Sequence, residues 1–357
     1  MIYVDFSGID FKEIVAASSE NLRRSVDREL AKQMPKFERD FYELIRAQAV
    51  DWLMLSPDDL EKKFAWMLID HEAFTVYASG RLEAMVDRIN RHRLPQYEKE
   101  WTTHRKNKSK NPSKKAKRLP VPCKCKFCTV SDRASRVFSW SAFTRKNVNQ
   151  IRSLAASFVH KVGLIVCPYC ARNYIAPLVG VDTDIYRPDL DHFYAQSIYP
   201  YFGICLSNLI PSCSACNCRI KLDEDFMMKG NFHPYLHKVP ERLFSVEGLS
   251  LIDSEIVRAA DIKIKVDRSL SEPLARSAKF FHLEAAYEVH IEEVSDFLTS
   301  LRFYPDKVLE ERARAIGVDP TAFKLSLRRS TESDGDYRKR PLGKLMRDLY
   351  HFAVVKT

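Results

Sequence analysis

The sequence predicts an α+β protein in which a central cysteine-rich module, stapled by a four-cysteine zinc site, lies between two mainly helical regions. Two CxxC motifs, which begin at Cys167 and Cys213, indicate the zinc site near the middle of the 357-residue chain. Apolar residues at helical spacing before and after these motifs indicate amphipathic helices. The length suffices for one large domain or two ordinary ones.

Composition and charge leave several classes of partner open. Hydrophobic residues make up 45% of the chain and charged residues 29%, as in ordinary globular proteins, so we do not expect a disordered chain. The net charge of +10 favours an anionic partner, such as nucleic acid, a membrane surface or an acidic protein. Solvated lysines produce the same balance, so charge alone does not decide among these partners.

The cysteines and the N-terminus bear on the compartment. All nine cysteines lie between Cys123 and Cys218. The first residues, MIYVDFSGID, lack the charged-then-apolar pattern of a signal peptide, and no apolar run approaches the length of a membrane span. We therefore expect a cytoplasmic protein with no membrane contact, in which clustered cysteines bind metal more often than they form disulfides.

Residues 1–104 are predicted to form a helical N-terminal region that serves as a scaffold. The segment Ser56-Pro57-Asp58-Asp59 has the capping hydroxyl, early proline and acidic residues that favour a helix start. The apolar residues at helical spacing are Phe37, Phe41, Leu44 and Ile45, and then Leu60, Phe64, Met67 and Leu68.

Residues 105–128 are predicted to be a basic linker that ends in a cysteine cluster. Residues 105–118 carry eight lysines and arginines and no acid, so they are expected to stay exposed. They either contact phosphates or remain a solvated linker. The candidate phosphate contacts are Lys114, Lys115, Lys117 and Arg118. The cluster consists of Cys123, Cys125 and Cys128. It either holds a second zinc ion, with His104 as a candidate fourth ligand, or consists of free surface thiols.

The remaining chain is divided into a central domain at residues 129–240 and a mainly helical C-terminal region at 241–357. The apolar side of a helix in the central domain is expected to carry Phe143, Ile151, Leu154 and Phe158. Alternation at Ile262, Ile264 and Val266 predicts a strand. A long helix is expected from Phe280 to Leu301, and a last helix after Pro341.

The two CxxC motifs predict a structural zinc site. Two such turns bring four thiolates together as a closed tetrahedral site, in which no position is left for substrate. The ligands are Cys167, Cys170, Cys213 and Cys216. The alternative is a set of buried free thiols, since cysteine is often buried; the doubled spacing argues against it.

A set of polar residues accompanies the cysteines. Asp191 and His192 lie between the two CxxC motifs, Asn208 follows them, and Asn217 stands directly after the last motif. This combination resembles the HNH nuclease superfamily over residues 167–221, with asparagine at the third position, where some members carry histidine. The resemblance identifies residues 129–240 as the nuclease domain.

The resemblance implies a ββα-metal fold and a division of labour. The first strand would end in Asp191-His192, a loop would carry Asn208, and a short helix from about Pro211 would supply Asn217. Asp191 and Asn217 would bind one Mg²⁺ or Mn²⁺ ion, because hard ions prefer oxygen ligands. His192 would deprotonate the attacking water, since an imidazole titrates near neutrality. Asn208 would hold the histidine-bearing loop.

A narrower resemblance is visible in the segments CPYCARNYI, LDHFYAQSIYPYF, NLIPSC, CNCRIK and HPYL. These are similar to the HNH subunit of Septu-type anti-phage systems, which accompanies an ABC-type ATPase. Lys221 lies four residues after Asn217, whereas many HNH proteins have three, and this spacing suits the narrower group. Lys221 is expected to contact nucleic acid, with DNA favoured over RNA. His233, before a proline, is either a late site residue or structural.

The sequence also permits a second class of function. A non-catalytic zinc-ribbon adaptor, which binds nucleic acid or a partner protein, needs the four cysteines but not the set of Asp191, His192 and Asn217. That set therefore distinguishes the nuclease from the adaptor.

Overall fold

The structure is a computed structural model of the chain. It describes residues 1–60, 62, 133–145, 153–179, 184–196, 199–224, 226–239, 242–248, 256–328 and 336–354. Predictions made for other residues lie outside this part. They concern Phe64, Met67, Leu68, His104, the basic run 105–118 with Lys114, Lys115, Lys117 and Arg118, the cluster of Cys123, Cys125 and Cys128, and Ile151.

The chain divides into two compact units. The first comprises Met1–Phe11, Thr144–Ala195 and Ser207–Thr357, and the second comprises Lys12–Phe143 and Gln196–Leu206. These units differ from the four predicted segments. The N-terminal residues join the first unit because Ile2 N donates to Pro168 O at 2.9 Å and Val4 N donates to Pro234 O at 2.9 Å.

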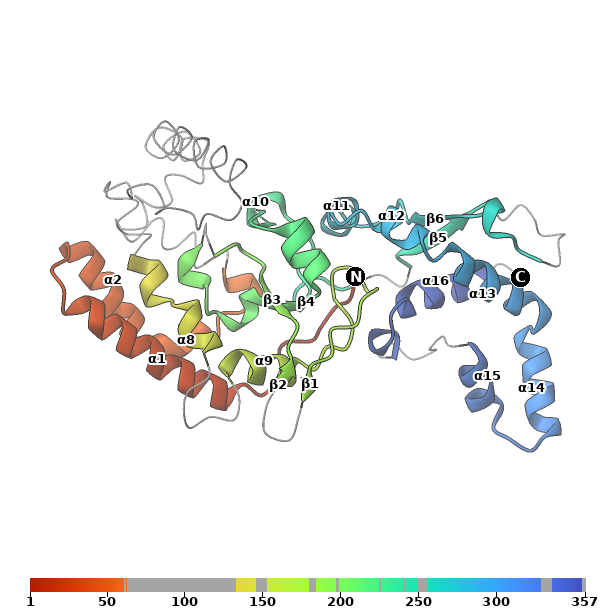
Figure 1. The fold of residues 1–357 in the computed structure, drawn as a ribbon, viewed down its shortest axis with the longest axis horizontal. Helices are drawn as coiled ribbons and strands as arrows, with labels where there is room; N and C mark the ends of the chain where they lie inside the picture. The colour runs from red at the N-terminus through yellow and green to blue at the C-terminus, as the bar shows by residue number, and fades with distance from the viewer. Residues whose placement is uncertain are drawn as a thin grey trace, which may run out of the picture. The chain divides into compact units, whose positions relative to one another are not determined.

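The described residues of the second unit are mainly helical. They include α1 (Lys12–Leu30), α2 (Lys36–Ala47), α3 (Ala49–Leu53) and most of α8 (Trp140–Thr144), with α1 packed on α2 and α3 (Figure 1). The predicted stripe on α2 is confirmed at Phe41 and Ile45, which are buried. Trp52 lies at the centre, where its indole N–H donates to Tyr201 O at 2.9 Å. The part of this unit that the structure describes holds none of the residues predicted for catalysis or for the four-cysteine zinc site.

The described residues of the first unit include three small antiparallel pairs of strands, so the α+β class is confirmed. They are β1 (Leu178–Val179) with β2 (Asp184–Tyr186), β3 (Asp189–His192) with β4 (Leu209–Ser212), and β5 (Phe244–Glu247) with β6 (Lys263–Val266). In the second pair Asp189 lies opposite Ser212 and His192 opposite Leu209. The π-helix η3 (Ala215–Lys221) follows β4 directly and packs on β3. The chain order at the centre is therefore strand, strand, helix (Figure 1).

The helix that precedes the first CxxC motif is shorter than predicted. Helix α9 (Leu154–Val162) begins where the Ser153 hydroxyl accepts from Ala156 N at 3.2 Å and ends at Gly163, whose φ is +64°. Phe143 belongs to the separate helix α8, so a single helix through Phe143 and Phe158 was wrong.

The C-terminal region is mainly helical. It contains α11 (Glu272–Phe280), α12 (Leu283–Glu288), α13 (Ile291–Phe303), α14 (Asp306–Ala315), α15 (Pro320–Arg328) and α16 (Gly343–Val354), whereas α10 (Phe226–Lys229) precedes it in the central domain. The prediction of one long helix from Phe280 to Leu301 was wrong. Left-handed backbone at His282, with φ +49°, interrupts the helical path, and a further break precedes α13. The strand at β6 and the last helix, α16, are confirmed.

A buried carboxylate joins α16 to β5. The Oδ2 atom of Asp348 accepts from Leu243 N at 2.7 Å and from Phe244 N at 2.9 Å, while Oδ1 accepts from Lys344 Nζ at 2.6 Å. Burial raises the pKa of Asp348, while the nearby charge of Lys344 acts to lower that pKa. Among the described residues, none of the helices combines the length and apolar character needed to cross a bilayer.

Candidate metal centre and active site

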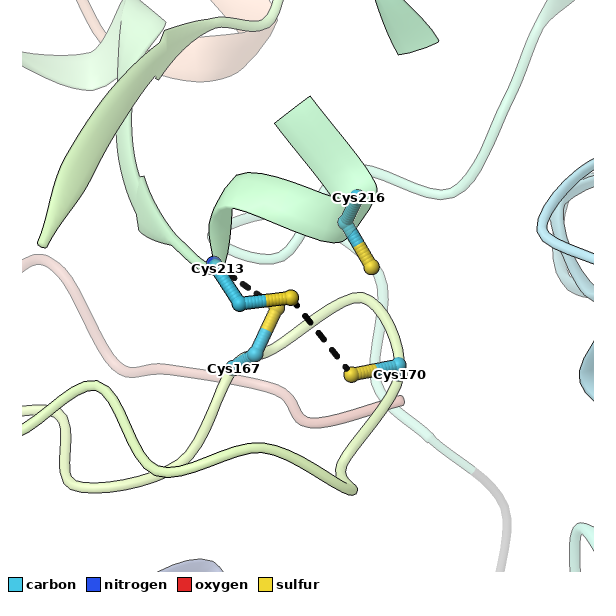
Figure 2. A group of neighbouring side chains, drawn as sticks. All are labelled: Cys167, Cys170, Cys213 and Cys216. Atoms are coloured by element: carbon cyan, nitrogen blue, oxygen red, sulfur yellow. Dashed lines mark hydrogen bonds between the residues drawn. The ribbon is translucent and has the colours of Figure 1, made fainter. Parts of the chain in front are cut away.

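The four predicted zinc ligands lie together and are buried. Their sulfur atoms are all within 4.8 Å of one another, and they converge on a common point in Figure 2. Cys167 and Cys170 lie in a tight turn, in which Ala171 N donates to Cys167 O at 2.8 Å. Cys213 follows β4, and Cys216 lies at the start of η3. One pair of ligands therefore comes from the turn at residues 167–171 and the other from the junction of β4 and η3.

Hydrogen bonds to sulfur support this cluster. Asn173 Nδ2 donates to Cys213 Sγ at 3.3 Å, and Cys213 N donates to Cys167 Sγ at 3.4 Å. Such donors stabilise thiolates and orient metal ligands. Asn173 lies three residues after Cys170, on the return of the same turn, where its backbone O accepts from Cys167 N at 3.0 Å.

The thiols affect one another's protonation strongly. Hydrogen bonds from neighbouring thiols, that of Cys167 first, hold the pKa of Cys213 far below its usual range. Hydrogen bonds with the other three thiols, that of Cys167 first, raise the pKa of Cys216, and burial raises the pKa of Cys167. A dication that accepts four thiolates removes this competition for protons. Within the described ranges, this is the one group of three or more histidine, cysteine or acidic ligands close enough to hold a metal ion. The cluster fits a structural ion such as zinc.

Asp191 is linked to the first CxxC turn through Tyr169 and is enclosed by protein. Its side chain is on β3 and the residue is 2% exposed. Oδ2 accepts a hydrogen bond from the Tyr169 hydroxyl, and Oδ1 accepts one from Lys221 Nζ at 2.9 Å. Tyr169 stands between Cys167 and Cys170 in the sequence, and Lys221 is the last residue of η3. The first CxxC turn, β3 and η3 therefore meet at one carboxylate.

Lys221 does not occupy the position expected for a phosphate contact. The residue is 1% exposed, and its ammonium also donates to His192 O at 2.7 Å. The ammonium lies 4.9 Å from the centre of the Phe226 ring. Its charge is directed into the protein, where Asp191 neutralises it. The predicted nucleic-acid contact by Lys221 does not fit this placement.

His192 is the last residue of β3 and is half-buried. Asn208, in the short turn η2 (Leu206–Asn208), is fully buried beside the segment that follows it. Asn208 Oδ1 accepts from Tyr194 N at 2.8 Å, Nδ2 donates to Tyr194 O at 3.2 Å, and Asn208 O accepts from Phe193 N at 2.9 Å. These three bonds fix the backbone of the two residues after His192.

Asn217 is half-buried on η3. The helix that carries it was predicted to start at about Pro211, and that start was wrong. Pro211 lies in β4 opposite Leu190, because the pairing of β3 with β4 keeps this segment extended until Cys213. Within η3, Leu222 N donates to Asn217 O at 2.9 Å, five residues back, which is the wide turn of a π-helix.

Sequence reasoning missed Tyr169, Asn173 and Tyr235. Tyr235 is buried, and its hydroxyl donates to Leu209 O at 2.8 Å, opposite His192 in the strand pair. The position of Tyr169 between two zinc ligands was a signal for it. For the others there was none, because their partners are distant in the sequence or are backbone atoms.

His233 has a packed, structural environment. Its ring centre lies 4.1 Å from that of Phe193, and its Nδ1 accepts from Tyr235 N at 3.2 Å. Burial, with a smaller contribution from His237, lowers the pKa of His233 to about 3. The neutral ring therefore supports the residue next to His192.

Comparisons with known proteins found no matching family model, no matching curated protein and no matching solved structure. The resemblance to HNH nucleases therefore rests on the motif residues alone.

Proposed function

We propose that the chain is an HNH-type endonuclease that hydrolyses phosphodiester bonds of nucleic acid. The observation that carries this proposal is the pair of hydrogen bonds by which the Asn208 side chain holds the backbone N–H and C=O of Tyr194. It fixes the backbone directly after His192 at the end of β3. A ribbon that only binds has no need to hold a half-buried histidine in this way. The order of β3, β4 and η3, with the motif residues along it, also supports a ββα module.

In this proposal His192 is the general base. Its imidazole takes a proton from water as the water oxygen attacks phosphorus; the bond from phosphorus to the leaving sugar oxygen breaks, and that oxygen keeps the electron pair and takes up a proton from solvent. An imidazole is half-protonated near neutral pH, so it can accept this proton under working conditions. Asn208 positions the backbone that carries the histidine and does not touch substrate.

The zinc-type site has a separate, structural task. Four thiolates saturate a tetrahedral ion, which leaves no open position for water or phosphate. The ion would fasten the turn of Cys167 and Cys170 to the end of β4 and the start of η3. Its contribution is to hold Tyr169 and η3 against β3.

The Mg²⁺ or Mn²⁺ ion implied by the resemblance does not fit Asp191 as it lies here. Both carboxylate oxygens already accept buried hydrogen bonds, one of them from a cation. A Mg²⁺ ion keeps several water ligands in an octahedral shell, and a carboxylate that is 2% exposed leaves no room for them. Asn217 still offers an amide oxygen on the half-buried side of η3.

The biological role of this activity is proposed from the narrower resemblance, to the HNH subunit of Septu-type systems. We propose a cytoplasmic effector nuclease of an anti-phage defence system, working with an ABC-type ATPase partner, on DNA in preference to RNA. The basic residues Lys114, Lys115, Lys117 and Arg118 are the proposed phosphate contacts. The second candidate is a zinc-ribbon adaptor without catalysis, which the buried cysteine cluster favours equally.

A cleavage panel separates the two candidates. Zinc-loaded full-length chain is incubated with labelled single- and double-stranded DNA and RNA, with Mg²⁺ or Mn²⁺ and with chelator. The panel is run with and without the proteins encoded beside its gene. The nuclease proposal expects new 5′ or 3′ ends on at least one substrate. Binding without cleavage under all of these conditions supports the adaptor.

A further inference from the structure

The surroundings of Asp191 assign it a partner other than a divalent ion. In this cluster, the side chain of Lys221 is fully buried and that of Asp191 is 3% exposed, with their atoms 2.9 Å apart. The Tyr169 hydroxyl occupies the second carboxylate oxygen. The chain itself therefore supplies the partners of Asp191: the cation comes from Lys221 on η3, and the second hydrogen bond comes from Tyr169 in the first CxxC turn.

We infer that Lys221 and Tyr169 are positioning residues for His192, and that the ammonium of Lys221, rather than a divalent ion, is the counter-cation of Asp191. The part that concerns His192 rests on the proposed function. The part that concerns the cation does not, because it is a statement about what Asp191 binds.

The contacts show how the positioning works. Lys221 Nζ joins two neighbouring residues of β3, through Asp191 Oδ1 and through the backbone O of His192 at 2.7 Å. The carbonyl of His192 is thereby bonded to a buried ammonium that Asp191 also binds, and Asp191 is itself held by Tyr169. Because the Asn208 side chain also bonds the backbone of Tyr194, the backbone is held both at His192 and at the residues that follow it.

The π-helix explains how Lys221 reaches this place. A π-helix closes its hydrogen bonds over five residues, so each turn contains more residues than an α-helical turn. The bond from Leu222 N to Asn217 O spans this wider turn. Helix η3 can therefore accommodate the four-residue step from Asn217 to Lys221 and still return the lysine to β3.

A divalent ion at Asp191 is disfavoured by charge as well as by space. An ammonium that is bonded to the same carboxylate would repel a dication at that oxygen, and low-dielectric surroundings strengthen such repulsion. To admit the ion, Lys221 would have to leave both Asp191 and His192 O, which would leave a buried ammonium without partners.

The claim that Lys221, and not a divalent ion, is the counter-cation of Asp191 is tested by Mn²⁺ binding. Binding is measured by electron paramagnetic resonance on the zinc-loaded protein. Wild type is compared with the neutral pair Asp191→Asn/Lys221→Met. The matched control is Asp348→Asn/Lys344→Met, which removes a second buried Lys–Asp pair of the same unit, 2.6 Å apart and with side chains that are 0% and 1% exposed. We expect the Mn²⁺ affinity of all three proteins to agree within about threefold, a small difference in free energy. An affinity that falls by a larger factor in Asp191→Asn/Lys221→Met alone overturns the inference.

A measurement on wild type covers the case in which a variant does not fold. Mn²⁺ broadens nuclear magnetic resonance signals of groups near its site. We expect no preferential broadening at residues 189–192 or at the side chain of Lys221. Preferential broadening there overturns the inference. Neither readout requires cleavage, so failure of this inference is distinguishable from failure of the nuclease proposal.

The positioning role is tested by the pH profile of single-turnover cleavage. Lys221→Met leaves Asp191 without its cation beside His192, and a nearby anion favours the imidazolium form. We expect the acidic limb of the profile to move to higher pH in Lys221→Met, with substrate affinity within about threefold of wild type. The control Lys344→Met is expected to leave the limb in place. An unmoved limb in a folded Lys221→Met protein overturns the positioning role.

Discussion

Replacing Lys221 by methionine should destabilise the protein strongly. The substitution keeps most of the side-chain volume but removes the charge, so the buried carboxylate of Asp191 loses its cation. Removal of one partner from a buried ion pair costs about 3–5 kcal/mol. For a unit of roughly 200 residues, each kcal/mol lowers the melting temperature by about 2–4 °C. The melting temperature is therefore expected to fall by about 6–20 °C, measured by circular dichroism on zinc-loaded protein.

A double-mutant cycle identifies the pair as the cause. Asp191→Asn/Lys221→Met removes both charges, so most of the stability should return, because replacing a whole buried pair is often nearly neutral. The control Lys62→Met breaks a surface pair with Asp59, at 3.6 Å and with 76% and 52% of the side chains exposed. It should leave the melting temperature nearly unchanged. A Lys221→Met protein that melts within about 2 °C of wild type would refute the role of the pair, as would a double variant less stable than the single one.

Three further predictions concern other parts of the chain. Cys213→Ser should lower zinc content by elemental analysis and lower the melting temperature, because zinc binding contributes about 10–16 kcal/mol to the folding of four-ligand sites; Cys205→Ser, a buried cysteine outside the cluster, should keep its zinc. Replacing Lys114, Lys115, Lys117 and Arg118 by Gln should lower the slope of log K against log salt by about 0.7–0.9 for each phosphate that is no longer bound, and an unchanged slope means a solvated linker. The pKa of His233 is lowered from 6.5 to about 3, so below pH 6.5 the unfolded chain binds a proton that the folded chain does not. The free energy of unfolding should then fall by about 1.4 kcal/mol per pH unit down to about pH 3, and His233→Phe should flatten this dependence.

Local patterns predicted several elements correctly. The apolar spacing of α2 and the alternation in β6 reflect burial of one face, which depends only on nearby residues. The four cysteines were predicted from spacing because each CxxC turn presents two ligands by its own geometry.

Errors arose where distant contacts decide the local conformation. Pro211 was expected in a helix, but pairing with Leu190 keeps it in a strand. The left-handed backbone of His282 is not indicated by any glycine or proline at that position. The helical pattern beyond it continued in the sequence, although the chain breaks into α11, α12 and α13.

The role of Lys221 shows the same limit at the site. A lysine next to a nuclease motif in a basic chain was expected to face phosphate. Its partner, Asp191, is 30 residues away in the sequence, and their contact depends on the pairing of β3 with β4 and on η3. Nothing in the spacing alone distinguishes a buried lysine from an exposed one.

The central claim, that His192 is the general base of a nuclease, is tested most directly by single-turnover cleavage with His192→Ala. Melting temperature and substrate affinity are measured on the same preparations, with the activating partner present if one is required. The matched control is His351→Ala, which removes an exposed histidine on α16. We expect cleavage by His192→Ala to fall by about 10²–10⁴-fold, while zinc content, folding and binding persist and the control keeps wild-type activity. Cleavage by His192→Ala at the wild-type rate would contradict the mechanism.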